Sequence, residues 1–167
     1  MALAFCIAVG LLAYTYAGYF LLLTLIGPIF RKRHRTEDNH RPTVTMVVSL
    51  HNEERHIAQL ISSFEALDYP AEKKELLLGD DCSTDQTRSI IRERAARNPH
   101  VRLVPFDTHQ GKTAVINQIV PQANGEIIAF TDANTFWQPD AMRLLTCHFA
   151  DPRVGAVGGR LVLRSST

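Results

Sequence analysis

The chain has 167 residues, 46% of them hydrophobic and 21% charged, and its 18 basic and 17 acidic residues give a formal net charge of +1. Because the basic residues after Pro42 are thinly spread and not clustered with aromatic ones, we expect no nucleic-acid binding. The three cysteines form neither a Cys-x-x-Cys pair nor a metal-ligand spacing, so they predict free thiols. The seven histidines are also scattered, which argues against a histidine-based metal site.

The first 30 residues predict a transmembrane anchor. No charged side chain occurs from Ala2 to Phe30, and this length is enough to cross a bilayer as a helix. A cleaved signal peptide would begin with basic residues, which this segment lacks. The basic run at 31–35 favours the cytoplasmic face, although a solvated linker would show the same composition. We therefore expect residues 1–30 to anchor the chain in the plasma (inner) membrane, with the amino terminus outside and the domain cytoplasmic.

Residues 31–42 are expected to be a basic juxtamembrane linker, and from residue 43 apolar runs alternate with helical patterns. Such alternation implies right-handed crossovers and a mostly parallel sheet with flanking helices, an α/β fold. The runs are short and rich in β-branched or apolar residues, as buried parallel strands are. The expected strands are 44–50, 76–78, 101–104, 127–130 and 154–163.

Four helices are expected between these strands. The first is capped by Asn52, the second is capped by Thr84 or Asp85 and ends near Arg97, and the third covers residues 111–120. Pro139 is expected at the first position of the fourth helix. Apolar stripes in the first and fourth helices predict their core faces; they are Ile57, Leu60, Ile61 and Phe64, and Met142, Leu145 and Phe149.

Two acidic turns, 79–85 and 131–134, each follow a predicted strand. Ligands of open α/β sheets bind beyond the carboxyl ends of the strands, so these acids are expected to converge on one site. The carboxylate of Asp81 can accept hydrogen bonds from the base or ribose of a nucleotide, while Asp80 is expected to point elsewhere. The alternative is that these residues only form and cap turns.

Asp132 and Asn134 predict a cation site. On an extended backbone, side chains two positions apart lie on the same side, so their oxygens could share one Mg²⁺ or Mn²⁺. Such ions complete their shells with diphosphate and water. An ordinary polar turn is the alternative.

Lys112 is a candidate phosphate contact. Residues 111–113 read Gly-Lys-Thr, but Phe106 stands where a P-loop requires glycine, so a P-loop ATPase is not expected. A lysine near a helix start can still meet phosphate, because the free N–H groups and the helix dipole attract anions. A solvated surface lysine is the alternative.

Taken together, residues 47–54, 80–85, 111–112 and 130–134 resemble family 2 glycosyltransferases, most closely the membrane-bound bacterial enzymes of extracellular polysaccharide synthesis. The resemblance covers residues 43–167. It implies the donor-binding part of a GT-A fold, the nucleotide-diphospho-sugar transferase type, and inverting transfer of a sugar from a nucleotide-sugar to a glycan or lipid-linked acceptor in cell-envelope or extracellular polysaccharide synthesis.

The resemblance also assigns roles to single residues. His51 and Glu53 would border the base, Asp81 would contact base or ribose, and Lys112 would lie near the donor. Asp132, which would also contact the donor, and Asn134 would bind the divalent cation, Mg²⁺ or Mn²⁺. Three residues depart from the family pattern: His51 replaces the usual Tyr, Cys82 the usual Gly and Asn134 the usual second Asp. We expect Cys82 to resist the positive φ that glycine accepts, and Asn134 to hold a cation less tightly than Asp.

The family places its catalytic base in a later Asp-containing motif, so we expect that base beyond Thr167 and interpret the chain as an amino-terminal part. Two other classes stay open. A nucleotidyltransferase would carry a glycine-rich, basic loop after its first strand, which residues 51–54 lack. A non-catalytic membrane subunit could retain the donor fold in order to pair with synthase subunits.

Overall fold

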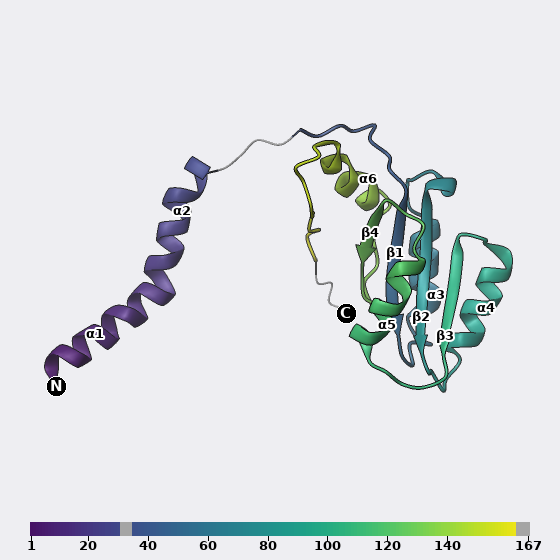
Figure 1. Cartoon of the computed structure of the whole chain (residues 1–167), viewed down its shortest axis with the longest axis horizontal. Helices are drawn as coiled ribbons and strands as arrows, with labels where there is room; N and C mark the ends of the chain where they lie inside the picture. The colour runs from purple at the N-terminus through teal and green to yellow at the C-terminus, as the bar shows by residue number, and fades with distance from the viewer. Residues whose placement is uncertain (31–34, 163–167) are drawn as a thin grey trace. The chain divides into compact units, whose positions relative to one another are not determined.

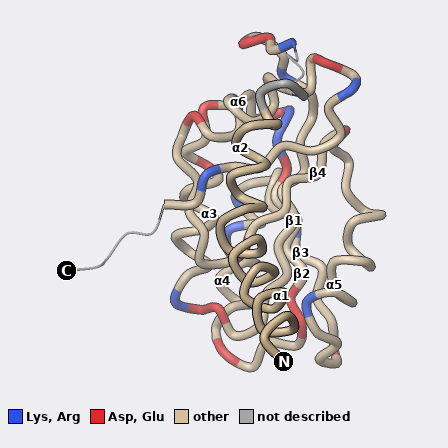
Figure 2. The backbone as a smooth tube through the Cα atoms, turned by 90° about the vertical axis from the view of Figure 1, so that its left-hand side faces the viewer, with Lys and Arg blue, Asp and Glu red and all other residues tan. Residues whose placement is uncertain are grey.

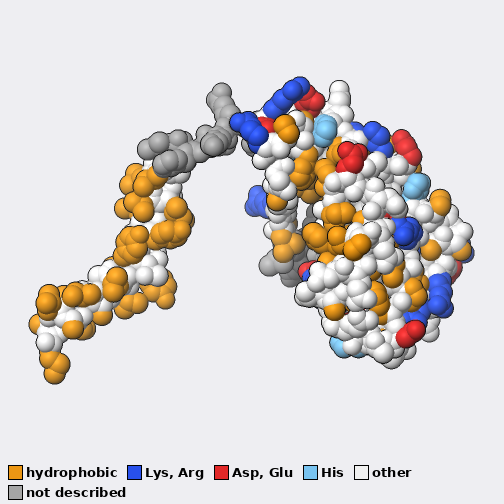
Figure 3. All heavy atoms as spheres, in the orientation of Figure 1, with side chains coloured by type: hydrophobic (Ala, Val, Ile, Leu, Met, Phe, Trp, Pro, Cys, Tyr) orange, Lys and Arg blue, Asp and Glu red, His pale blue; other side chains and the backbone are white. Residues whose placement is uncertain are grey.

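The computed structural model describes residues 1–30 and 35–162. The chain divides into two compact units, Met1–His34 and Arg35–Thr167. The first unit is helical: α1 is Ala2–Ala13, the π-helical turn η1 is Tyr14–Gly18, and α2 is Tyr19–Phe30. Within the described residues, Ala2–Gly27 is the one helix whose length and composition suit a membrane span, and apolar side chains cover its surface (Figure 3). Except for Arg35, the predicted basic run lies outside the described residues.

The second unit is built on a four-stranded parallel sheet (Figure 1). Its strands are β1 Val44–Leu50, β2 Lys74–Asp81, β3 Val101–Phe106 and β4 Ile127–Phe130, in the spatial order β3-β2-β1-β4. The predicted α/β fold class is therefore confirmed. Strand β2 is longer than predicted, because it begins at Lys74 and continues into the first acidic turn as far as Asp81.

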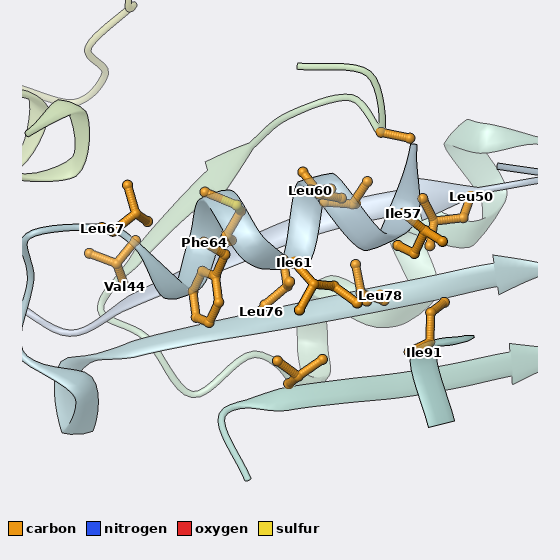
Figure 4. Close-up of a cluster of buried hydrophobic side chains, with 14 of the residues drawn as sticks. Val44, Leu50, Ile57, Leu60, Ile61, Phe64, Leu67, Leu76, Leu78 and Ile91 are labelled. Carbon is orange, nitrogen blue, oxygen red and sulfur yellow. The ribbon is translucent and has the colours of Figure 1, made fainter. Parts of the chain in front are cut away.

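Alternating side chains of β1 and β2 divide the core between the two faces of the sheet. On one face, residues such as Met46, Val48 and Leu78 pack against helices α3, Ile57–Glu65, and α4, Thr87–Arg97. Figure 4 shows α3 lying over the strands, nearly along them, with its predicted apolar residues turned towards them. On the other face, Val47 and Leu77 pack against α5, Lys112–Ile119. Both faces are covered, as a parallel sheet requires.

The order of the strands creates a switch point at β1. The chain moves outward from β1 to β2 and β3, with α3 and α4 on one face, and then returns with α5 on the other face to place β4 on the far side of β1. Where neighbouring connections leave in opposite directions, a crevice opens at the carboxyl ends of the strands. The switch point lies between β1 and β4, and the acidic turns at the ends of β2 and β4 leave the sheet at this carboxyl edge.

Four sequence-based details of the elements differ from the structure. Asn52 does not cap α3, which begins only at Ile57 after His56. The helix α6 is Ala141–Thr146 and continues as the 3₁₀ turn η4, Cys147–Ala150, so Pro139 precedes the helix instead of opening it. The N-cap residue of α4 is Gln86 and neither Thr84 nor Asp85, although Asp85 Oδ1 accepts the Thr87 N–H at 3.0 Å. Two further 3₁₀ turns, η2 Ala71–Lys73 and η3 Val120–Gln122, precede β2 and follow α5.

The strand predicted at 154–163 is wrong for the described part, because residues 154–162 contain no strand. Gly155, Gly158 and Gly159 lower the strand propensity there, and no ladder partner is formed by the described residues. Strand β4 consequently has a neighbouring strand, within residues 35–162, only on its β1 side.

Gly125 is required by the close approach of the turn before β4 to β1. A Cβ atom at this position would lie 2.4 Å from the Thr45 backbone nitrogen and 2.7 Å from the Val44 carbonyl carbon. Backbone atoms cannot rotate away as a side chain can. We therefore expect Gly125→Ala to lower the free energy of unfolding by about 2–3 kcal/mol.

Urea unfolding of the full chain in detergent measures this loss, with the fluorescence of Trp137, the chain's only tryptophan, as the probe. Gly155→Ala is the matched control, because its added Cβ meets nothing within 4 Å. A loss no larger for Gly125→Ala than for the control would contradict the packing argument.

Glu75 joins the amino ends of the strands on the edge of the sheet opposite the switch point. Its carboxylate accepts from Thr45 Oγ1 at 2.7 Å and from Asn124 Nδ2 at 2.9 Å, and it pairs with Arg102. These groups line a hollow of about 280 Å³. Burial raises the pKa of Glu75, but the hydrogen bonds from Arg102, Thr45 and Asn124 outweigh it and hold the pKa below its usual value.

We expect Glu75→Gln to lower the free energy of unfolding by about 1 kcal/mol at neutral pH, because the neutral amide loses the charge-assisted hydrogen bonds. A lowered pKa stabilises the fold above the unfolded value of 4.5, and that contribution is lost as pH falls through the folded pKa. The difference between variant and parent should therefore shrink as the pH falls below 4.5, as measured by urea unfolding. Glu72→Gln, an exposed neighbour in the same hollow, is the control. A difference that does not depend on pH would contradict the assignment.

Candidate functional site

The parallel register brings both acidic turns to one edge of the sheet. Leu50 pairs with Asp80, Asp81 with Phe106, and Val47 with Phe130. The loops that begin at residues 51, 82, 107 and 131 therefore leave the sheet side by side. The hollow beside Glu75 lies at the opposite edge, and its central carboxylate is already paired, so we place the candidate site at the carboxyl edge.

Hydrogen bonds tie the turn after β1 to the turn after β2. The Asn52 N–H donates to Ser83 Oγ, and Asn52 Oδ1 accepts the Thr84 N–H, both at 2.9 Å. Asn52 and Cys82 have positive φ angles, 55° and 59°. The expectation that Cys82 would resist this conformation is wrong: the tight turn imposes it at a local cost. Cys82 Sγ also lies 3.4 Å from the Asp107 carbonyl oxygen, which it can reach as a donor.

Asp85 strengthens the same junction. Its carboxylate accepts the N–H groups of Thr87 at 3.0 Å and Glu54 at 3.2 Å. Burial raises the pKa of Asp85, but hydrogen bonds from the Thr87 hydroxyl and from these N–H groups hold the pKa below its usual value. Asp85 is therefore a structural carboxylate of the turn, which is the role that the sequence allowed for it.

Asp80 and Asp81 point in different directions, as alternation predicts. Asp80 is fully buried; its Oδ2 accepts from Arg88 Nε at 2.6 Å, and Arg88 also donates to the Phe106 carbonyl at 2.8 Å. This pair fastens α4 to the ends of β2 and β3. Asp80 is thus part of the frame that holds the turn.

Asp81 holds the loop that precedes α5. Its Oδ1 accepts the Gln110 N–H at 2.7 Å and its Oδ2 accepts the Gly111 N–H at 2.8 Å. The side chain of Asp81 is only 2% exposed. Direct contact with a base or ribose, the role expected from the sequence, would require the groups above the carboxylate to move. That role stays a prediction, while the anchoring of the loop is observed.

His109 is the group that covers Asp81, and sequence reasoning missed it. Its Nδ1 lies 2.9 Å from Asp81 Oδ2, and its ring stands 4.5 Å from the His51 ring, at an interplanar angle of 49°. His51 Nδ1 lies 2.7 Å from the Asp81 carbonyl oxygen; since a carbonyl only accepts, Nδ1 carries the proton and Nε2 can accept from Asn52. The signal that could have revealed His109 is its place two residues before Gly111.

Lys112 and Asp132 form an ion pair through Lys112 Nζ and Asp132 Oδ1. Lys112 is the first residue of α5, and Asp132 follows β4, so the pair links the two loops across β1. Figure 2 shows acidic and basic segments near the start of α5. Since Gly111 contacts Asp81 and the next residue contacts Asp132, the structure brings His51, Asp81, Lys112 and Asp132 into one cluster.

The backbone at Asp132 is not extended, as the sequence argument assumed. The Thr135 N–H donates to the Asp132 carbonyl at 3.1 Å, so residues 132–135 form a turn and alternation does not govern the side chains. Asp132 and Asn134 are both exposed. A carboxylate and an amide oxygen, open to solvent, are donors that suit Mg²⁺ or Mn²⁺ together with phosphate and water. The chemistry of these two donors fits the predicted cation, but the described residues contain no group of three or more His, Cys, Asp or Glu side chains that could hold a metal ion.

Glu53 is not brought into this cluster. Its Oε2 lies 2.8 Å from His56 Nδ1, and its N–H donates to Thr87 Oγ1 at 2.8 Å. These contacts direct the residue towards the starts of α3 and α4. Its predicted place beside the base stays a prediction.

Comparisons with known proteins place this geometry in a class. The structure resembles the mannosyltransferase PcManGT from Pyrobaculum calidifontis, solved in complex with GDP-Man and Mn²⁺, with a TM-score of 0.79 and 30% identity over 90% of this chain and 45% of that chain. It also resembles Staphylococcus aureus TarS 1–349 in complex with UDP-GlcNAc, with a TM-score of 0.57 and 27% identity over 60% of this chain and 29% of that one. The fold is thus that of the GT-A glycosyltransferases.

The profile of glycosyl transferase family 2 matches residues 45–167, and the chain belongs to this family. Among its curated relatives are a beta-monoglucosyldiacylglycerol synthase of Synechocystis sp., 30% identical over 70% of this chain, and a poly-beta-1,6-N-acetyl-D-glucosamine synthase of S. aureus, 27% identical over 91%. The chain spans 25% of the length of the first and 39% of the second. The family therefore includes relatives named for glycolipid and polysaccharide synthesis.

The anchoring role of Asp81 can be tested by Asp81→Asn. The amide keeps one acceptor oxygen but turns an NH₂ group towards a buried backbone N–H, which should lower the free energy of unfolding by about 2 kcal/mol. Urea unfolding measures the loss, and hydrogen exchange should show faster exchange at residues 109–112. Asp107→Asn, which removes the same charge from an exposed carboxylate, is the control. Equal effects of the two substitutions would rule out the anchor.

Proposed function

We propose that this chain forms the donor site of an inverting glycosyltransferase, which moves a sugar from a nucleotide-sugar to a glycan or lipid-linked acceptor in cell-envelope or extracellular polysaccharide synthesis. The observation that carries the proposal is the cluster at the switch point. Two consecutive residues, Gly111 and Lys112, contact Asp81 and Asp132 from separate strands. One small molecule can therefore reach groups that follow β1, β2 and β4.

The groups of this cluster suit the parts of a nucleotide-sugar. In the proposal, the His51 ring offers a surface on which a base can stack, and Asp81 beside it offers acceptor oxygens once His109 moves aside. Lys112 offers an ammonium at the start of α5, where the helix dipole also favours anions. In this proposal the base of the nucleotide would contact His51 and Asp81, and the diphosphate would contact Lys112.

Asp132 and Asn134 would hold the divalent cation, Mg²⁺ or Mn²⁺. When bound, such a cation stabilises the negative charge that develops on a departing diphosphate. The chain's own contribution is to keep Asp132 beside Lys112, so that the diphosphate is oriented by both residues. The structural neighbour PcManGT was solved with both GDP-Man and Mn²⁺, which supports a divalent cation beside the donor in this chain as well.

The acceptor and the location are proposed from the relatives and from the first unit. The names of the two curated relatives mention a glucosyldiacylglycerol and a poly-N-acetylglucosamine, which supports a lipid-linked or glycan acceptor. We propose that Ala2–Gly27 spans the plasma membrane, with the amino terminus outside, and that residues 31–42 link it to a cytoplasmic domain. Synthase partner subunits would then meet the domain at the membrane.

Binding of nucleoside diphosphates tests the proposal. The full chain in detergent, titrated with UDP and with GDP by calorimetry, should bind at least one of them about tenfold more tightly with Mn²⁺ than without any divalent ion, because cation and diphosphate share the site. Asp132→Asn should remove most of the Mn²⁺ effect, whereas Asp107→Asn should keep it. Affinity that is independent of Mn²⁺ would overturn the proposal and favour a non-catalytic subunit.

A further inference from the structure

The ion pair between Lys112 and Asp132 lies on the surface. The two side chains are 60% and 61% exposed, so both can leave the pair without disturbing the core. The loop before Lys112 is fixed, because Gln110 and Gly111 donate their N–H groups to the buried Asp81. Movement of the pair therefore concerns the lysine side chain, with its four-carbon stem, while its backbone stays in place.

A lysine ammonium and a divalent cation are alternative partners for this carboxylate. Both are positive and both bind carboxylate oxygens, so an ammonium on Asp132 repels a dication approaching the same group. The neutral amide of Asn134 supplies no charge to offset that repulsion. In the ion-paired state, Asp132 therefore attracts a lone Mg²⁺ or Mn²⁺ poorly.

A diphosphate changes this balance. Its oxygens offer the ammonium a more highly charged partner at the start of α5, where the helix dipole already favours anions. Lysine suits such an exchange, because it is a point charge on a flexible stem. Once Lys112 turns to phosphate, Asp132 is free for the cation.

We propose that Lys112 occupies the place of the cation on Asp132 until the diphosphate of the donor arrives, so that the metal is bound together with the donor and not before it. This inference rests on the proposed function and deepens it by setting the order of binding. It assigns two successive partners to Lys112, first Asp132 and then phosphate.

The test measures Mn²⁺ affinity in the absence of nucleotide. Electron paramagnetic resonance of free Mn²⁺, in titrations of the full chain in detergent, should give about two- to tenfold tighter binding for Lys112→Met than for the parent, because an exposed ion pair and a repelling charge are both removed. Arg92→Met, which removes one positive charge from the exposed surface of α4, is the matched control and should leave the affinity unchanged. Lys112→Gln provides a second, polar replacement.

The second arm repeats the titrations with saturating UDP and with saturating GDP. In the parent, at least one nucleotide should tighten Mn²⁺ binding about tenfold. In Lys112→Met this factor should be several times smaller, because no ammonium occupies Asp132 before the nucleotide binds. If a nucleotide tightens Mn²⁺ binding in the parent but both Lys112 variants bind lone Mn²⁺ no better, the inference fails and the proposed function stands. If neither nucleotide affects Mn²⁺ binding in the parent, both fail.

Discussion

The candidate site depends on one buried interaction, the acceptance of two consecutive backbone N–H groups by the carboxylate of Asp81. Both of its oxygens accept hydrogen bonds at the end of β2, where the side chain is buried and an unpaired polar group is costly. Because the bonded residues directly precede α5, the interaction fixes where that helix begins. The position of Lys112, and through it the contact with Asp132, follows from that starting point.

A second set of hydrogen bonds holds the turns after β1 and β2 at the same carboxyl edge of the sheet. The Asn52 N–H donates to Ser83 Oγ, and Asn52 Oδ1 accepts the Thr84 N–H. Arg88 donates both to Asp80 and to the Phe106 carbonyl at the end of β3. The polar and charged side chains in these contacts are of the types that also bind ligands, but here they hold the turns in place. The carboxylates of the acidic turn thus have two roles: Asp80 and Asp85 hold the turn in place, and Asp81 anchors the loop before α5 within the candidate cluster.

The sequence predicted the four strands well because periodicity and strand propensity report directly on burial between two helical layers. It failed where long-range contacts decide the local conformation. Asn52 is a good helix cap by type, yet the neighbouring acidic turn takes its side chain. Cys82 adopts a positive φ because the turn requires it, and residues 154–162 contain no strand despite their apolar character. His109 belongs to no motif, and its place two residues before Gly111 was the one sequence signal for its contact with Asp81.

The outer edge of strand β4 is open to pairing with a further strand. Within residues 35–162 its outer side meets no other strand, and Phe130 at its end is 60% exposed. The backbone groups of such an edge can accept a further strand by hydrogen bonding. An added segment would arrive directly beside Asp132 without displacing β1 or β2. New side chains can therefore be added at this margin while β1, β2 and β3 keep their positions.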